Sequence, residues 1–160
     1  LSDHPEKPGS KAWRAAFPRI CSWVKLKDRA TGREFFHFNT HLDHKGAVAR
    51  QESLRLIADT LKALSGDTMA LFVMGDMNVE PEDSALIPMY DYMHWSQAEA
   101  KKTTDMKTFT GFRHRPEKEK IIDFIFYRNA TAEQFEVLCD TTRVPFLSDH
   151  RPIQAIFKVR

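Results

Sequence analysis

Six consecutive apolar residues at positions 69–74 constrain the fold of this chain more than any other feature. An apolar run without polar alternation is typical of a strand that is buried on both faces. The run stops at Gly75 and Asp76, so we expect the strand to end there.

A single long helix is predicted over residues 46–64, followed by Ser65 and by Gly66, which suits a helix C-terminus. Its apolar residues recur every three or four positions and form one stripe: Leu54, Ile57, Ala58, Leu61 and Leu64.

Further strands are predicted at residues 20–27, 34–39, 108–112, 121–127, 135–140 and 153–159, with a hairpin turn at 28–32. A short helix is predicted over residues 81–90, and residues 1–18 are expected to be irregular. No linker divides the 160 residues, so we expect one domain. Strands outnumber helices and the connections vary in length, which favours an α/β or α+β fold over a regular βαβ repeat.

Composition excludes several classes of protein. The chain has 24 basic and 22 acidic residues, a balance that provides no broad field for steering nucleic acid. No apolar stretch is long enough to span a membrane, and the polar, proline-rich residues 1–9 do not form a secretory signal. We therefore expect a soluble protein, in a compartment that the sequence leaves open.

Cys21 and Cys139 are too few for a disulfide framework and are expected to be buried thiols.

Polar side chains collect where the predicted strands begin or end, which is where α/β sheets place ligand sites. Each has an ordinary structural explanation when taken alone, such as turn formation or a salt bridge. The set comprises His41, Asp76, Asn78, Asp123, Asp149 and His150.

Together these residues point to phosphoester hydrolysis. Four of them supply hard oxygen ligands of the kind that Mg²⁺ or Mn²⁺ prefers. The two histidines titrate near neutral pH. A metal can neutralise phosphate oxygens, a base can deprotonate water, and an imidazole can stabilise the developing negative charge.

Four short motifs occur in an order that resembles the endonuclease/exonuclease/phosphatase superfamily, which includes DNase I-like metal-dependent phosphoesterases. They are NTHL at residues 39–42, GDMN at 75–78, IDFIF at 122–126 and SDHRP at 148–152. The resemblance covers the chain from about residue 18 to its end. It implies an α/β fold that forms part of a four-layered α/β sandwich with mixed, largely antiparallel sheets.

The resemblance also implies roles for individual residues. Asp76 and Asn78 would contact the attacking water and the phosphate, and His41 would face the phosphate. His150 would be the catalytic histidine, oriented by Asp123.

Asp149 would be the metal ligand for Mg²⁺ or Mn²⁺. Arg19, Asn39, His44 and Arg50 would contact the substrate.

Family members carry a further N-terminal part with a metal-binding glutamate, and nothing before residue 18 resembles it. We therefore expect residues 1–160 to be the C-terminal portion of one such domain, without its N-terminal half. The piece alone is expected to be inactive and to expose a sheet face through which it self-associates.

Two other functions stay open. Residues 40–46 resemble part of the metallo-β-lactamase motif of zinc hydrolases, although Asn39 stands at the position of its first histidine. A non-catalytic binding module of the same fold is the second alternative. The phosphoester substrate is not specified, because the superfamily cleaves DNA, RNA, inositol phosphates, sphingomyelin and small nucleotides. The charge balance neither demands nor excludes nucleic acid.

Overall fold

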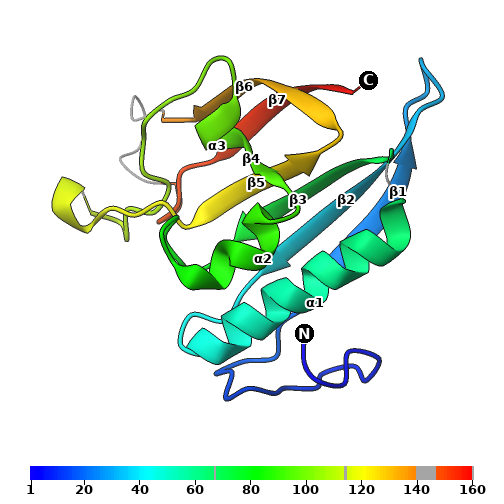
Figure 1. The fold of residues 1–160 in the computed structure, drawn as a ribbon. Coiled ribbons are helices and arrows are strands. Elements are labelled where there is room, and N and C mark those ends of the chain that lie inside the picture. The colour runs from blue at the N-terminus through cyan, green and yellow to red at the C-terminus, as the bar shows by residue number, and fades with distance from the viewer. Residues whose placement is uncertain (67, 114, 140–146, 160) are drawn as a thin grey trace.

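The computed structural model describes residues 1–66, 68–113, 115–139 and 147–159 (Figure 1). Its strands are β1 (Cys21–Lys27), β2 (Glu34–His41), β3 (Ala70–Asp76), β4 (His94–Trp95), β5 (Asp123–Arg128), β6 (Ala130–Val137) and β7 (Ile153–Val159). Its helices are α1 (Ala47–Ser65), η1 (Ser84–Leu86), α2 (Ile87–Tyr90), α3 (Ser96–Glu99) and η2 (Pro116–Lys118). None of the helices in these described ranges is both long and apolar enough to cross a membrane.

Five strands form the main sheet in the order β1-β2-β3-β5-β4. The β2–β3 pair is parallel and is joined by α1, whereas the other neighbours in this sheet are antiparallel. The predicted α/β class with a mixed sheet is therefore confirmed, and the 69–74 run forms the central strand β3.

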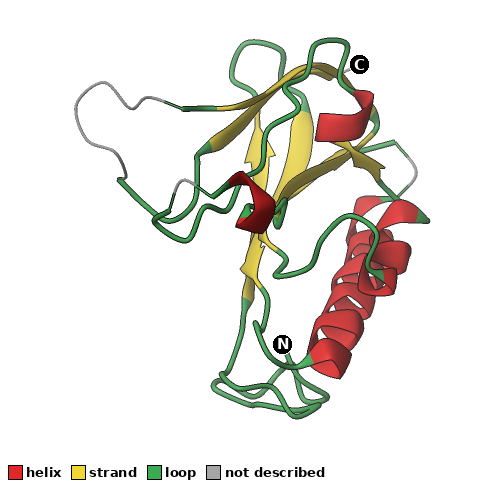
Figure 2. Ribbon diagram, turned by 90° about the vertical axis from the view of Figure 1, so that its left-hand side faces the viewer, coloured by secondary structure: helices red, strands yellow, loops and turns green. Residues whose placement is uncertain are grey.

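One face of the main sheet packs against α1, η1 and α2 (Figure 2). Phe36 and Phe38 of β2 both point toward this face, because every second side chain of a strand lies on the same side. They meet the apolar stripe of α1, in which Leu54 and Leu61 have no exposed surface. The predicted helix is thus confirmed, and burial of its stripe stabilises the βαβ unit.

The opposite face of the main sheet is covered in part by the two-stranded sheet β6–β7. Phe72 and Tyr127 contact Phe157 of β7 through their rings, and Ile125 packs with Phe135 and Val137 of β6. This second sheet lies over β3 and β5.

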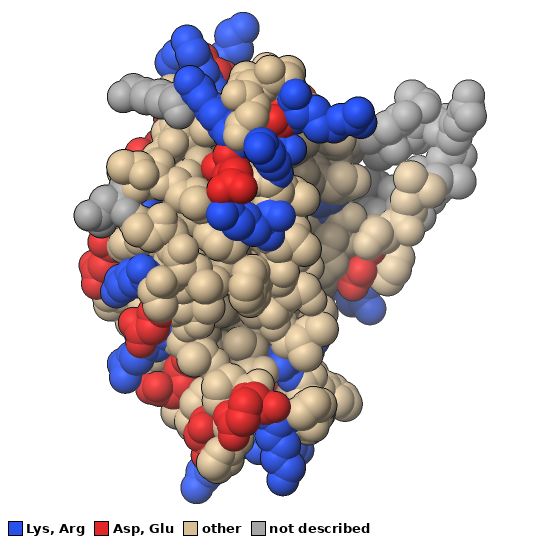
Figure 3. Space-filling model, turned by 90° about the vertical axis from the view of Figure 1, so that its right-hand side faces the viewer, with Lys and Arg blue, Asp and Glu red and all other residues tan. Residues whose placement is uncertain are grey.

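The remainder of that face, chiefly over β1, is open. Val24 pairs with His37 and Leu26 pairs with Phe35, so these four side chains share one face of the sheet, on which Phe35 packs against Phe72. Val24 is 49% exposed and Leu26 is 43% exposed. Figure 3 views the molecule from the side on which β1 lies, and an area without charged side chains occupies its centre. The exposed apolar area on this side consists of Val24 and Leu26, and self-association through it stays a prediction.

Several predicted elements differ from the structure. Residues 108–112 form no strand, because Phe109 makes only isolated bridges to Lys120 and His150. The helix predicted over 81–90 begins at Ser84, and the strand predicted over 135–140 begins at Ala130 and ends at Val137. Asp140 lies outside the described residues.

The two cysteines are less buried than predicted. Cys21 is half-buried, and burial raises the pKa of its thiol to about 11. Cys139 is exposed, so the prediction that both thiols are buried is wrong. The residues around Cys139 resemble a strand in sequence, but β6 ends at Val137, before Cys139 is reached.

Candidate active site

Strand register brings three of the predicted site residues together. His41 at the end of β2 pairs with Asp76 at the end of the parallel β3. Asp76 also pairs with Asp123, the first residue of the antiparallel β5. The three side chains therefore lie side by side at one edge of the main sheet.

This arrangement requires a glycine directly before Asp76. Gly75 has a φ of +143°, and a Cβ built on it would lie 1.8 Å from the Thr40 carbonyl oxygen. The missing side chain allows β2 and β3 to approach at their ends, which positions His41 next to Asp76.

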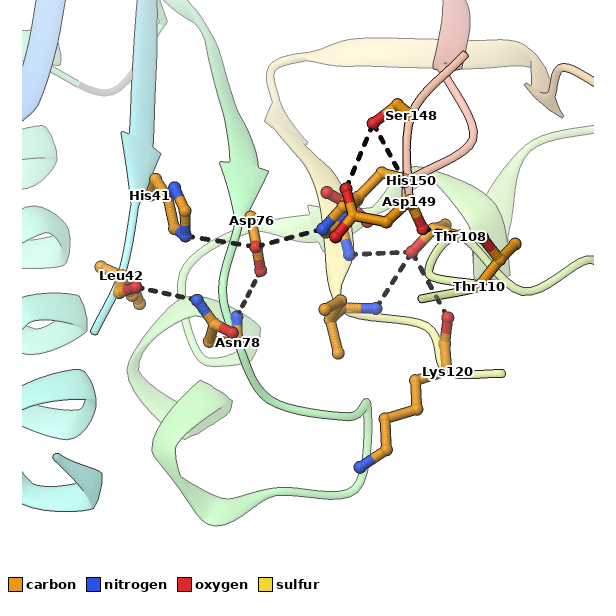
Figure 4. A network of polar contacts seen from close by, with 12 residues as sticks. His41, Leu42, Asp76, Asn78, Thr108, Thr110, Lys120, Ser148, Asp149 and His150 are labelled. Atoms are coloured by element: carbon orange, nitrogen blue, oxygen red, sulfur yellow. Dashed lines mark hydrogen bonds and ion pairs between the residues drawn. The ribbon is translucent and has the colours of Figure 1, made fainter. Parts of the chain in front are cut away.

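The Asp76 carboxylate lies between two imidazoles (Figure 4). Its Oδ2 is 3.3 Å from His41 Nε2 and 3.8 Å from His150 Nε2. Burial raises the pKa of Asp76, and the nearby Asp123 carboxylate raises it further. Asp76 is thus better suited than an exposed carboxylate to accept a proton from water.

His150 is oriented by the partner that the motif resemblance implies. Its Nδ1 lies 2.8 Å from Asp123 Oδ2, which leaves Nε2 toward Asp76. The hydrogen bond with Asp123 raises the pKa of His150, and burial offsets only part of this effect. The imidazolium form is therefore stabilised beside the site.

Asn78 is held by two hydrogen bonds that also explain its place in a turn. Its backbone N–H donates to Asp76 Oδ1 at 2.8 Å, and its Nδ2 donates to the Leu42 carbonyl at 2.9 Å. Its φ of 52° is one that asparagine tolerates better than most residues. Asp76 and Asn78 thus form the turn and also reach the pocket.

A buried threonine ties the Asp123 and His150 segments together. The Thr108 hydroxyl accepts hydrogen bonds from the backbone N–H groups of Ile122 and Asp123 at 3.1 and 3.2 Å. The Thr108 carbonyl accepts from the backbone N–H of Arg151 at 2.7 Å. Thr108 therefore fixes the backbone at Asp123 and next to His150, the two members of the pair.

A pocket of about 900 Å³ opens over these groups. Eight of the ten predicted site residues line it: Arg19, His41, His44, Arg50, Asp76, Asn78, Asp149 and His150. Asp123 reaches the site through His150. Asn39 does not line this pocket, because β2 continues to His41 and Asn39 pairs with Met74 inside the sheet.

The sequence reasoning missed several residues that line the pocket. The turn after Asn78 contributes Glu80, Glu82 and Asp83, and Lys120 pairs with Glu80 at 3.1 Å. Phe109 packs edge-on against His150. The acidic residues directly after the GDMN motif were the available signal for this part of the wall.

The donor set fits a hard divalent cation. Asp76, Asp123 and His150 offer ligand atoms that all lie within 4.8 Å of one another. The 2.8 Å contact with Asp123 already engages Nδ1 of His150, so carboxylate oxygens are the better ligands here. Asp149 borders the same pocket outside that cluster, and its metal-binding role stays a prediction.

Comparison with known proteins identifies the family. The model of the endonuclease/exonuclease/phosphatase family matches residues 8–150 of the chain. The chain belongs to this family. The family resemblance seen in the four motifs is confirmed, and the metallo-β-lactamase alternative is left without support. No match to the chain is found among curated proteins.

Solved structures of this family superpose closely. An endonuclease/exonuclease/phosphatase from Bacteroides vulgatus is 32% identical with a TM-score of 0.92, covering 99% of this chain and 62% of that chain. Mannosyl-6-phosphatase Bt3783 of Bacteroides thetaiotaomicron is 31% identical with a TM-score of 0.82, covering 92% of this chain and 60% of that one. The chain thus spans about 60% of the length of these family members.

A more distant structure shares the fold alone. TDP2 of D. rerio, complexed with a single-strand DNA product, is 16% identical with a TM-score of 0.72, covering 91% of this chain and 64% of that chain. The DNase I-like α/β architecture expected for the family is therefore present in this chain.

Proposed function

We propose that the protein is a phosphoester hydrolase that depends on Mg²⁺ or Mn²⁺. The observation that carries this proposal is the Asp76 carboxylate between two imidazoles, one of which is held by Asp123. A base, a stabilised imidazolium and hard oxygen ligands then face one pocket, as hydrolysis of a phosphoester requires.

Each residue has a distinct task in this mechanism. Asp76 accepts a proton from the attacking water, because burial favours its protonated form. The Asn78 amide is fixed by the Leu42 carbonyl and orients the water or phosphate with its second N–H. His150 stabilises negative charge through Nε2 while Asp123 holds Nδ1.

The metal would be held by carboxylate oxygens, with Asp149 as the proposed ligand. When bound, it would neutralise charge on the phosphate oxygens. Asp149 also lines the pocket, so metal and substrate would occupy one site.

A sugar phosphate is the first candidate substrate. The Bacteroides thetaiotaomicron protein named mannosyl-6-phosphatase is 31% identical to this chain. The carboxylates of Glu80, Glu82 and Asp83 border the pocket and can accept hydrogen bonds from sugar hydroxyls. A nucleic acid is the second candidate, and a net charge of +2 does little to favour it.

We also infer that the chain is the C-terminal portion of a longer family domain, since it spans about 60% of the length of the matched structures. The 160-residue chain alone would then lack a second metal-ligand carboxylate and have little activity. Its open sheet face would associate with a second copy of the chain.

Metal removal and one substitution test the function. Excess EDTA should abolish hydrolysis by the whole protein across a panel that includes mannose 6-phosphate and a single-stranded oligonucleotide. His150→Ala should lower kcat by at least about a hundredfold, the scale of a positioned acid or base. His94→Ala is the matched control, because His94 pairs with Glu99 away from this pocket. Full activity in EDTA, or in His150→Ala, would contradict the proposal.

A further inference from the structure

Two arginines border the active-site pocket without a carboxylate partner. Arg19 precedes β1 and Arg50 lies in α1, and both line the pocket on the side of His44. Among the residues that the structure describes, no acidic side chain forms an ion pair with either guanidinium, and both Nε atoms are buried without an acceptor. Arg55 and Arg151, in contrast, pair with Glu52 and Glu119.

The Arg50 guanidinium is held in place by the backbone around Asp43, which also anchors the segment that precedes Arg19. Arg50 Nη1 donates to the Asp43 carbonyl at 3.0 Å. The buried Asp43 carboxylate accepts from the backbone N–H groups of Phe17 at 3.0 Å and Gly46 at 2.6 Å. This ties the segment that leads into Arg19 to the start of α1.

Ring stacking also holds the pocket wall that contains Arg19, His44 and Arg50. The Phe17 ring lies 5.8 Å from the His44 ring at an interplanar angle of 23°, and the Arg19 guanidinium is 6.0 Å from the Phe17 centroid. Because this wall is ordered before a ligand arrives, little ordering cost opposes binding of an anion.

The number of phosphate oxygens decides which anion fits. A guanidinium pairs best with two oxygens of one phosphate at a time. The metal and His150 must engage at least one terminal oxygen on the catalytic side. A phosphate monoester has three terminal oxygens and keeps two for the arginines, whereas a diester keeps only one. A monoester is also close to dianionic at neutral pH, which suits two unpaired cations.

We propose that Arg19 and Arg50 make this site selective for phosphate monoesters by binding two terminal oxygens of the phosphate. This proposal rests on the proposed hydrolase function and names its substrate class. In the reaction, the oxygen of water bonds to phosphorus, the bond from phosphorus to the ester oxygen breaks, and the departing alcohol takes up a proton. The products are inorganic phosphate and an alcohol.

A pair of chromogenic substrates tests the selectivity. p-Nitrophenyl phosphate and methyl p-nitrophenyl phosphate share a leaving group and differ by one terminal oxygen. The whole protein with Mn²⁺ should prefer the monoester. Arg19→Ala and Arg50→Ala should each lower kcat/KM for the monoester at least about tenfold, the scale of one lost charge-assisted hydrogen bond, and less than about threefold for the methyl ester.

Two further variants serve as controls. Arg55→Ala, on the same helix but paired with Glu52, should leave both rates unchanged. Arg50→Lys keeps the charge but loses the planar fork, so its monoester rate should fall between those of the wild type and Arg50→Ala. Thermal unfolding of each variant separates lost binding from lost folding.

The outcomes separate this proposal from the hydrolase function itself. Equal losses on both substrates, no loss on either, or a wild type that prefers the methyl ester would overturn monoester selectivity while the hydrolase function stands. If neither compound is cleaved, calorimetry with EDTA-treated protein decides instead. Inorganic phosphate should then bind more tightly than dimethyl phosphate, and Arg50→Ala should remove the difference. Equal binding of the two anions would overturn the proposal.

Discussion

Asp43 shows how a buried carboxylate can be stabilised without a cationic partner. Burial alone would raise its pKa, but backbone N–H groups of Gly46, Phe17 and Lys45 outweigh burial and hold the pKa of Asp43 below its ordinary value. Asp43→Asn replaces one acceptor oxygen with an amide donor. We expect the free energy of unfolding to fall by about 1–3 kcal/mol, as measured by urea denaturation at pH 7.

The pH dependence of this variant follows from the direction of the shift. Because the pKa of Asp43 is lower in the folded chain, its stabilising effect is present above the unfolded pKa of about 4 and is lost as the pH falls further. The difference between wild type and Asp43→Asn should therefore shrink below about pH 4. Asp59→Asn, on the exposed side of α1, is the control. A difference that grows in acid would contradict this account.

The Asp123–His150 pair leads to a second prediction at this scale. Asp123→Asn weakens the hydrogen bond that contributes most to the raised pKa of His150 and also removes the charge of its partner, so that pKa should fall, as followed by NMR titration of the imidazole. Turnover should fall by about tenfold or more, since His150 loses its orientation. Metal affinity should stay within about threefold. A large loss of metal binding would instead make Asp123 a direct ligand.

Most residues of the candidate site could be predicted because their motifs end or begin strands. His41, Asp76 and Asp123 became neighbours through strand pairing, which short motifs anticipate. The motif resemblance implies a place for Asn39 at the site, but β2 runs to His41 and Asn39 does not line the pocket. The anchoring by Asp43 was not predicted, since its partners are backbone groups from a segment without a recognisable pattern.

Gly75 sets the geometry of two whole strands. Gly75→Ala would place a methyl group against the Thr40 carbonyl, which belongs to the backbone of β2 and cannot rotate away. It would also hold alanine at a φ that L-residues rarely adopt. We expect a loss of at least about 3 kcal/mol in the free energy of unfolding, or no folded protein at all.

Gly32→Ala is the matched control for that substitution. Gly32 also has a positive φ, but it lies in an exposed turn, and a new Cβ would meet only the Lys27 side chain at 3.9 Å. Its cost should stay near about 1–2 kcal/mol, the price of the left-handed conformation. Equal losses for the two variants, by urea denaturation, would show that the close approach at Thr40 is unimportant.

Elements with clear periodicity could be predicted, and those defined by single contacts could not. The α1 stripe and the β3 run have patterns that hold over many residues. Residues 108–112 resemble a strand in composition, but the Thr108 and Thr110 N–H groups donate to Lys120 and Asp149 rather than to one neighbouring strand. The two-residue strand β4 is too short to leave any periodic signal.

We expect the uneven covering of the main sheet to affect how the 160-residue chain associates in solution. Val24 and Leu26 of β1 are exposed on the side that β6–β7 does not cover. We expect the chain alone to form dimers or larger species, and Val24→Lys to shift it toward monomer, as measured by light scattering. Lys62→Ala, on the opposite side in α1, should not change the mass. A monomeric wild type would contradict self-association.

The overall architecture was predictable to the level of an α/β fold with a mixed sheet. A strand buried on both faces implies layers on either side, and the structure has them over β3 and β5. How much of each face is covered depends on contacts far apart in sequence, such as Phe72 with Phe157. Local patterns contain no information on those contacts.

Thr108 joins three stretches of chain that are distant in sequence: its own, the start of β5 and the backbone of Arg151. A hub of this kind makes local opening cooperative, because breaking it releases the carboxylate and the imidazole in the same event. We therefore expect the pair to be assembled or lost as a unit, with few intermediate geometries. Thermal fluctuation would thus change the fraction of competent molecules while leaving the rate of each competent molecule unaltered.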